Sequence, residues 1–94
     1  MDRVIWKWEI PRDKMGLFEC EMPEGAQILT CQVQNGGPVV WALVNPNARL
    51  TKMRFRILGT GDRHSDMANW TYVSTFQLLE GAFIGHLFVR GDKL

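Results

Sequence analysis

The clearest pattern along the chain is an alternation of apolar and polar residues with a period of two. This period is typical of β-strands that bury one face. The segments that alternate are Arg3–Ile10, Leu17–Met22, Ala26–Gln34, Lys52–Leu58, Trp70–Leu78 and Ala82–Val89. Val39–Val44 is apolar at every position, so we expect a central strand covered on both faces. No segment clearly favours a helix.

The hairpin expected over Ala26–Asn45 is the most strongly specified unit. Its two strands meet at Asn35-Gly36-Gly37, residues that accept the positive φ angles of a tight hairpin turn. We expect this hairpin to be scaffold rather than binding site. The hairpin side chains expected in the core are Cys31, Val33, Trp41 and Leu43.

Seven short strands separated by turns predict an all-β fold. The strands should be mostly antiparallel and should form a small sandwich or an open barrel. With 94 residues, the chain is expected to be a single domain over 1–94. Its 46% hydrophobic content is that of an ordinary globular domain and argues against disorder.

Charge and cysteine content narrow the expected setting. A formal net charge of +1 predicts no general attraction to nucleic acid or to an anionic membrane. No run approaches the roughly 20 apolar residues that span a bilayer, so we expect no membrane partner. No signal-peptide pattern precedes Cys20 and Cys31, so we expect free thiols and a cytoplasmic location.

The sharpest charge feature is a row of cations on one strand face. Lys52, Arg54 and Arg56 alternate there, and Arg63 follows in the next loop. Such a row can receive nucleic-acid phosphates, an anionic nucleotide or an acidic protein surface. Alternating charge is also the normal pattern of a solvated strand face. In that case the cations would pair across the sheet with Glu9, Glu19 or Glu21, or protect an edge.

Two loop motifs are candidates for ligand binding. Gly59-Thr60-Gly61, followed by Asp62, could cradle a phosphate with backbone amides, but the P-loop lysine and its helix are missing. The alternative is a turn that ends a strand. Asp62, His64 and Asp66 alternate in the polar loop, yet their spacing matches no established metal site. We therefore expect no metal and no cofactor.

Aromatic residues offer a further surface. The chain has four tryptophans, which could stack nucleic-acid bases. We expect Trp41 to be packed in the core. Trp70 is the exception, because it borders the polar loop and could contribute to binding.

Catalysis has little support. Cys20 or Cys31 with His86 would be a conceivable nucleophile and base. Both cysteines, however, lie on expected apolar faces, where a thiol is normally inert. Ser74 has no nucleophile-elbow motif around it. We therefore expect a protein that is not an enzyme.

Short motifs run nearly from end to end of the chain. They are Trp6-Lys7-Trp8, Met22-Pro23-Glu24-Gly25-Ala26 with Ile28-Leu29, Gln32-Val33-Gln34, Trp41-Ala42-Leu43-Val44-Asn45-Pro46, Gly59-Thr60-Gly61 and Thr75-Phe76-Gln77. In order and spacing they resemble a family of small uncharacterised proteins of phages, prophages and bacteria. The chain departs from that family at three positions. Asp62 stands where a histidine is frequent, Ser74 where a glycine is frequent, and Arg90 where the last strand usually ends in an acidic residue.

This resemblance implies a phage setting, in which small non-catalytic proteins often act stoichiometrically against host machinery. We expect an inhibitor that occupies a surface of a host defence component, such as a CRISPR complex, in the bacterial cytoplasm. The contacts expected for a host protein partner are Lys52, Arg54, Arg56, Arg63, His64 and Trp70.

Three alternatives stay open. One is a sponge that sequesters an anionic signalling nucleotide, with Gly59, Thr60, Gly61 and Asp62 as its ligand loop. Another is a single-stranded nucleic-acid-binding module that uses Trp70 and the basic face. The third is a virion or assembly component. A homodimer is also expected, because the chain should have an exposed strand edge and is rich in aromatic residues.

Overall fold

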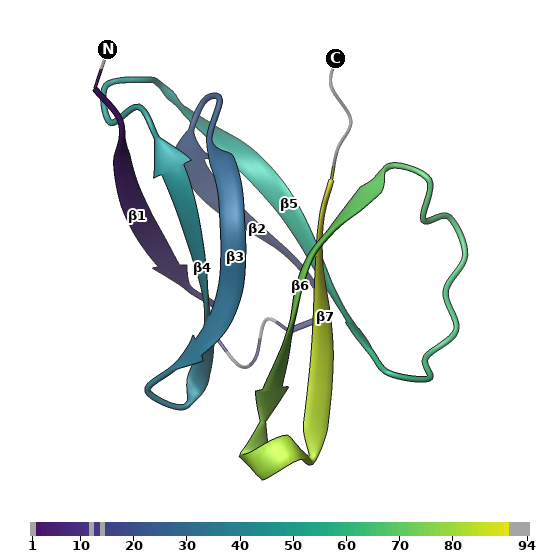
Figure 1. Cartoon of the computed structure of the whole chain (residues 1–94). Coiled ribbons are helices and arrows are strands. Elements are labelled where there is room, and N and C mark those ends of the chain that lie inside the picture. Colours follow the sequence, from purple (N-terminus) through teal and green to yellow (C-terminus); the bar gives the residue numbers. More distant parts are fainter. Residues whose placement is uncertain (1, 12, 14, 91–94) are drawn as a thin grey trace.

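Seven antiparallel strands in two facing sheets make up the fold (Figure 1). The structure is a computed structural model and describes residues 2–11, 13 and 15–90. The strands are β1 (Val4–Glu9), β2 (Leu17–Pro23), β3 (Gln27–Gln34), β4 (Gly37–Val44), β5 (Leu50–Gly59), β6 (Trp70–Leu78) and β7 (Phe83–Arg90). A short 3-10 helix, η2 (Leu79–Gly81), links the last two. The expected all-β fold is confirmed, and it is a sandwich rather than a closed barrel.

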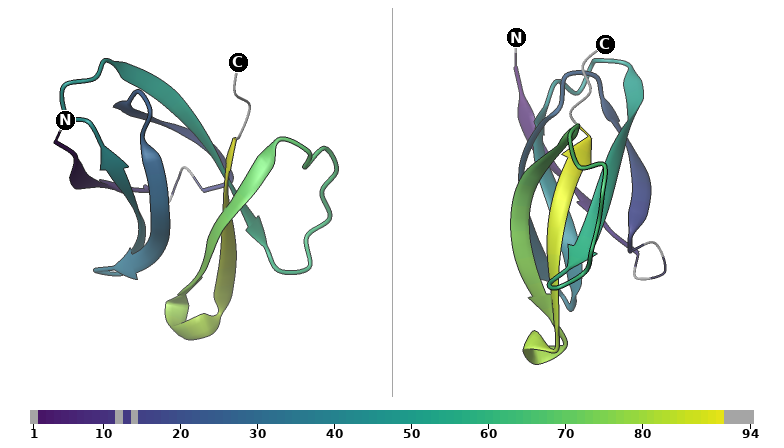
Figure 2. Two further views of the ribbon diagram at one scale, coloured as in Figure 1. Left: turned by 45° about the horizontal axis from the view of Figure 1, so that its top comes forward. Right: turned by 90° about the vertical axis from the view of Figure 1, so that its right-hand side faces the viewer.

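The two sheets differ in size. One contains three strands in the order β1-β4-β3, and the other contains four in the order β2-β5-β7-β6. The molecule is flattened, with principal extents of 42 × 32 × 19 Å (Figure 2). Among the described residues, no helix is long and apolar enough to cross a membrane.

The expected hairpin is confirmed as β3 and β4. Asn35 and Gly36 both have positive φ, at 54° and 83°, and Gln34 pairs with Gly37. This is the two-residue turn whose twist matches that of the flanking strands. β4 pairs with β1 on its other side, so it is the central strand of its sheet, as expected.

The core lies between the sheets, but part of the expected core is wrong. Cys31 is buried, whereas Val33 is 40% exposed. Trp41 and Leu43 lie half-buried on the outer face of the three-stranded sheet, because Val40, Ala42 and Val44 take the inner face. β4 is therefore covered by the second sheet on one face only. The residues buried in the core cluster are Ile10, Phe18, Met22, Cys31, Val40, Phe55, Ile57, Phe76, Leu78 and Leu87.

Side chains join the two sheets along both long sides. On one side, where β3 and β6 run next to each other, the Ser74 hydroxyl accepts a hydrogen bond from the Cys31 N–H and donates one to its carbonyl. On the other side, the Trp8 indole N–H donates to the Glu21 carbonyl at 3.0 Å. These bonds hold the sandwich together without closing it into a barrel.

Candidate functional site

The outer face of the four-stranded sheet brings together side chains from all four strands. Arg54 pairs with Glu19 on β2, and Trp70 on β6 pairs with Arg90 on β7. Phe55 on β5 pairs with Val89 on β7. One step further in this antiparallel register, Arg54 and Arg90 lie opposite each other. Since side chains alternate between faces, this register places the arginines and Trp70 on one surface.

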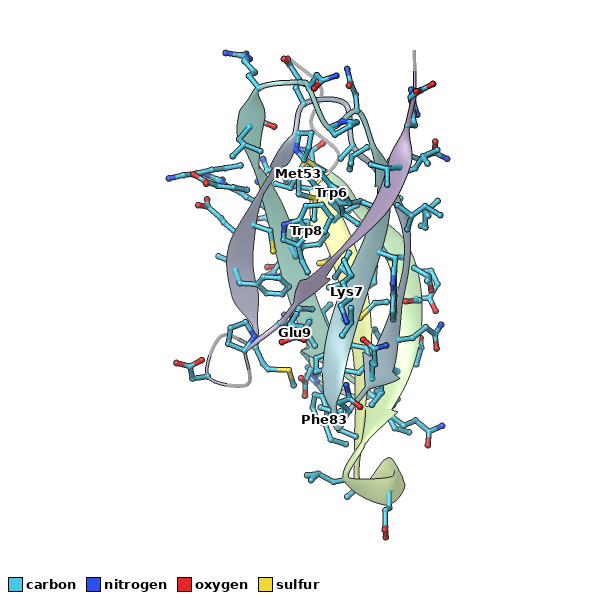
Figure 3. All side chains as sticks on the ribbon, turned by 90° about the vertical axis from the view of Figure 1, so that its left-hand side faces the viewer. Trp6, Lys7, Trp8, Glu9, Met53 and Phe83 are labelled. Atoms are coloured by element: carbon cyan, nitrogen blue, oxygen red, sulfur yellow. The ribbon has the colours of Figure 1, made fainter. Side chains whose placement is uncertain are left out.

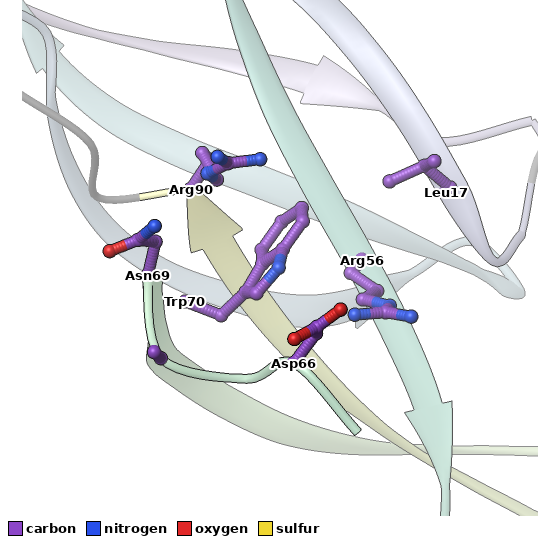
Figure 4. A pocket seen from close by; sticks show the side chains of 7 residues that line it. Leu17, Arg56, Asp66, Asn69, Trp70 and Arg90 are labelled. Atoms are coloured by element: carbon purple, nitrogen blue, oxygen red, sulfur yellow. The ribbon is translucent and has the colours of Figure 1, made fainter. Parts of the chain in front are cut away.

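Trp70 is the centre of this surface, and two guanidinium groups lie against it. The Cζ atom of Arg56 is 5.5 Å from the centre of the indole ring, and that of Arg90 is 5.7 Å away. Figure 4 shows the indole between the two arginine side chains. Both distances are those of cation–π contacts, which orient the guanidinium groups. We call Arg54, Arg56, Trp70 and Arg90 the arginine–tryptophan platform.

Two shallow hollows flank the platform. The first has a volume of about 360 Å³ and is lined by Leu17, Arg56, Asp66, Ala68, Asn69, Trp70 and Arg90 (Figure 4). The second has a volume of about 630 Å³ and is lined by Leu17, Phe18, Glu19, Arg54, Trp70 and Arg90. The two hollows share Trp70 and Arg90, so the platform presents one continuous, open surface.

The arginines of the platform have different neighbours. Arg54 forms an ion pair with Glu19 at 3.1 Å, which is the cross-strand pairing considered from the sequence. Arg56 directs Nη1 to the Met67 sulfur at 3.4 Å, and it forms no ion pair with any residue that the structure describes. A thioether is a weak acceptor, so Arg56 keeps most of its capacity to bind an anion. Glu9 does not pair with the cations of this face, because β1 belongs to the other sheet.

The remaining expected contact residues surround the platform without joining it. Lys52 lies on the same face, opposite Glu21. Arg63 and His64 are exposed in the loop between β5 and β6, and neither lines the two hollows beside the platform. The structure thus groups Arg54, Arg56 and Trp70.

Arg90 is the platform residue that sequence reasoning missed as a contact. Arg90 lies one residue beyond the end of the last strand expected from the sequence. In the sequence it stands out only because the similar family usually has an acidic residue at this position. In the structure, β7 continues through Arg90 and pairs with both β5 and β6. The alternation of β7 was the available signal, since Phe88 and Arg90 share a face.

The Gly59-Thr60-Gly61 motif forms a turn that the side chain of the next residue, Asp62, closes. The Gly59 amide donates to the Asp62 carboxylate at 3.0 Å, and the Asp62 amide donates to the Gly59 carbonyl at 3.2 Å. A Cβ atom at Gly59 would lie 2.9 Å from the same carboxylate oxygen, so a side chain at this position would require Asp62 to move. The Gly59 amide is thereby engaged by an internal anion. A phosphate would have to displace Asp62 to use it.

A chain of hydrogen bonds crosses this face beside the turn. The Thr60 hydroxyl lies 2.7 Å from Nε2 of His86, and Nδ1 of His86 lies 2.9 Å from the Thr75 hydroxyl. The Tyr72 hydroxyl is 2.7 Å from that of Thr75. Both nitrogens of the His86 ring therefore have hydroxyl partners.

The cysteines are separated from His86 by the sheet. Burial raises the pKa of Cys31 to about 12 and also raises the pKa of Cys20. Both thiols are therefore protonated at neutral pH. They face the interior, whereas His86 is on the outer face, so the structure does not bring together the nucleophile and base considered from the sequence.

Among the residues that the structure describes, no three His, Cys, Asp or Glu side chains lie close enough to hold a metal ion. This includes Asp62, His64 and Asp66, which alternate in the loop without converging on one point.

Comparison with known proteins adds a family but no activity. No curated protein and no solved structure matches the chain significantly. One family model, described as a domain of unknown function, covers residues 1–93. The chain belongs to this family, DUF7352.

Proposed function

We propose that the chain is a non-enzymatic binding protein that docks its arginine–tryptophan platform on an acidic surface of a partner protein. The observation that carries this proposal is the pair of guanidinium groups within 6 Å of one indole on an open sheet face. Arginine and tryptophan are enriched among the residues that dominate binding energy. A guanidinium held by an aromatic ring also loses less side-chain freedom when it meets a carboxylate.

The arrangement around Trp70 favours carboxylate recognition over base stacking. The indole lies between Arg56 and Arg90, so a nucleobase would have to displace an arginine to reach the ring (Figure 4). Single-strand binders instead need open aromatic faces and a basic groove. The net charge of +1 also gives little general attraction to nucleic acid.

The nucleotide sponge has less support than protein binding. In the loop expected to bind its phosphate, the Gly59 amide already donates a hydrogen bond to the Asp62 carboxylate. The negative charge of this carboxylate would repel a phosphate. The platform arginines are the main candidates to bind an anionic group, whether it is a protein carboxylate or a nucleotide phosphate.

We further propose a biological setting for this binding. The resemblance to phage and prophage proteins supports a stoichiometric inhibitor in the bacterial cytoplasm. Its partner would be a host defence component, such as a CRISPR complex, whose acidic surface the platform covers. This step rests on the resemblance alone, whereas the platform rests on the geometry described above.

Capture of a partner from a lysate of the bacterial host tests the proposal. The Arg56→Glu variant should lose at least about tenfold in capture, because a repulsive charge replaces a contact guanidinium. Arg49→Glu is a matched control: it makes the same charge change at the exposed ion pair with Glu24, outside the platform. Equal capture by wild type and Arg56→Glu would contradict the proposal.

Two binding assays separate the alternatives. Binding of random single-stranded DNA with a steep salt dependence would favour the nucleic-acid module. A rise in melting temperature with an anionic nucleotide would favour the sponge. Absence of both, together with Arg56-dependent capture of a protein, is the result expected here.

A further inference from the structure

β1 has the least protected backbone edge in the two sheets. β3 and β6 run next to each other, and each contains a bulge, between Ile28 and Thr30 and between Tyr72 and Ser74. β2 ends in Pro23, and the Trp8 indole covers it by bonding to a carbonyl. β1 pairs with β4 from Val4 to Glu9 without a register shift and has no proline. Bulges, prolines, covering groups and charged side chains are the usual protections of an edge, and of these β1 has only the charges of Lys7 and Glu9.

The first half of this edge is also apolar. Val4 is 38% exposed, Ile5 55% and Trp6 39%, three consecutive residues of one strand. In Figure 3 β1 is the foremost strand, and the labelled side chains of Trp6, Lys7, Trp8 and Glu9 lie along it. Large apolar side chains on an open edge form a ready site for pairing with another strand.

The backbone of β1 has the right groups to pair. The Ile10 amide donates to the Pro38 carbonyl at 3.0 Å, and the register places Trp8 opposite Val40 on the same ladder. In an antiparallel ladder, alternate residues direct their N–H and C=O groups to opposite sides. The even-numbered residues therefore bond to β4. Ile5, Lys7 and Glu9 present their backbone groups to the open edge.

We propose that β1 pairs with β1 of a second copy of this chain, antiparallel and with Trp6 on the two-fold axis. Charge selects this register. Centred on Trp6, the pairing sets Arg3 opposite the partner's Glu9, and symmetry makes that attractive pair twice. Centred on Ile5, it would oppose Arg3 and the partner's Lys7, and centred on Lys7 it would oppose two lysines. Centres at Val4 or Trp8 leave at least half of the strand unpaired.

The proposed register also suits the apolar residues. Trp6 meets the partner's Trp6 at a non-hydrogen-bonded position, where cross-strand side chains come closest. Val4 lies opposite the partner's Trp8. The two three-stranded sheets become one six-stranded sheet. This inference goes beyond the proposed function and gives each dimer two arginine–tryptophan platforms, so a partner with repeated acidic sites would be bound more tightly than by one copy.

Charge exchange in the full-length chain tests the pairing. Arg3 and Glu9 of one strand are about 20 Å apart, at roughly 3.3 Å per residue, so they cannot pair within a chain. By sedimentation equilibrium, Arg3→Glu and Glu9→Arg should each weaken dimerisation about tenfold, because two attractive pairs become repulsive. The double variant should return to within a few-fold of wild type. A wild-type chain that stays monomeric at high micromolar concentration would overturn the proposal, as would a double variant no better than the singles.

Cross-linking checks the register independently. Cα atoms at a non-hydrogen-bonded position are about 4.5 Å apart, which a disulfide can span. Trp6→Cys should form a covalent dimer under mild oxidation, whereas Ile5→Cys, which faces the partner's Lys7, should not. Wild type measures the background from Cys20 and Cys31. Equal cross-linking of the two variants would overturn the two-fold at Trp6. If Trp6→Cys fails to fold, the charge exchange between the exposed residues Arg3 and Glu9 still tests the pairing.

Discussion

The Ser74 hydroxyl on β6 forms hydrogen bonds with both backbone groups of Cys31 on β3, at 2.8 Å each. β3 and β6 belong to different sheets and are not paired by a backbone ladder. The serine side chain therefore takes the place of a strand partner for the buried Cys31. This contact joins the two sheets along one side of the sandwich.

Ser74→Ala should destabilise the protein by about 1–3 kcal/mol, because it leaves backbone groups of a buried residue without this partner. The free energy of unfolding in urea measures the effect. Thr71→Ala, at an exposed position on the same strand, is the control and should change stability by no more than about 0.5 kcal/mol. Similar losses in the two variants would show that the Ser74 bonds do not hold the sheets together.

Gly85→Ala should also destabilise the fold, by about 1–3 kcal/mol, through overpacking. A Cβ atom at Gly85 would lie 2.6 Å from Cζ of Phe76 on the neighbouring strand. Phe76→Leu removes that ring atom, so the double variant should lose less stability than the sum of the two single losses. Thermal or urea unfolding of the four proteins measures the coupling. Additive losses would contradict the proposed clash.

Stability should fall as the pH rises above about 9, partly because of Cys31. The pKa of its thiol is raised by burial from an ordinary 9.0 to about 12 in the folded protein. Between these values the unfolded chain releases a proton that the folded chain keeps, so unfolding becomes easier as pH increases. Unfolding measured from pH 7 to 11 in wild type and Cys31→Ala isolates this effect. The variant should lose stability less steeply than wild type, and equal slopes would contradict the assignment.

Glu19→Gln should strengthen capture of the acidic partner proposed for the platform, by about two- to fivefold. Glu19 forms an ion pair with Arg54 and competes for its guanidinium. Glu21→Gln makes the same charge change on the same face, opposite Lys52, and should have a smaller effect. Stability should change by no more than about 0.5 kcal/mol, since the Glu19 pair is exposed. Equal gains in the two variants would attribute the effect to net charge alone.

The strands were largely predictable because each leaves a local pattern. The expected boundaries lie within two residues of those observed, and the Asn35-Gly36 turn was recognisable from residues that accept positive φ. The shared face of Arg54 and Arg56 was also predictable, because alternation on one strand needs no knowledge of its neighbours. The bulge in β3 between Ile28 and Thr30 was not, because it exists only in the pairing of β3 with β4.

The sequence by itself therefore determined the all-β class, the strand segments, the main hairpin and the basic face of β5. Local backbone preferences and the two-residue period decide these features. The tertiary structure alone decided that Trp70 lies between Arg56 and Arg90, and that Trp41 lies on an outer face. Strand order and sheet pairing decide these relationships, because they bring together residues that are distant along the chain. The open edge of β1 has the same origin, since an edge exists only after every other strand has taken its place.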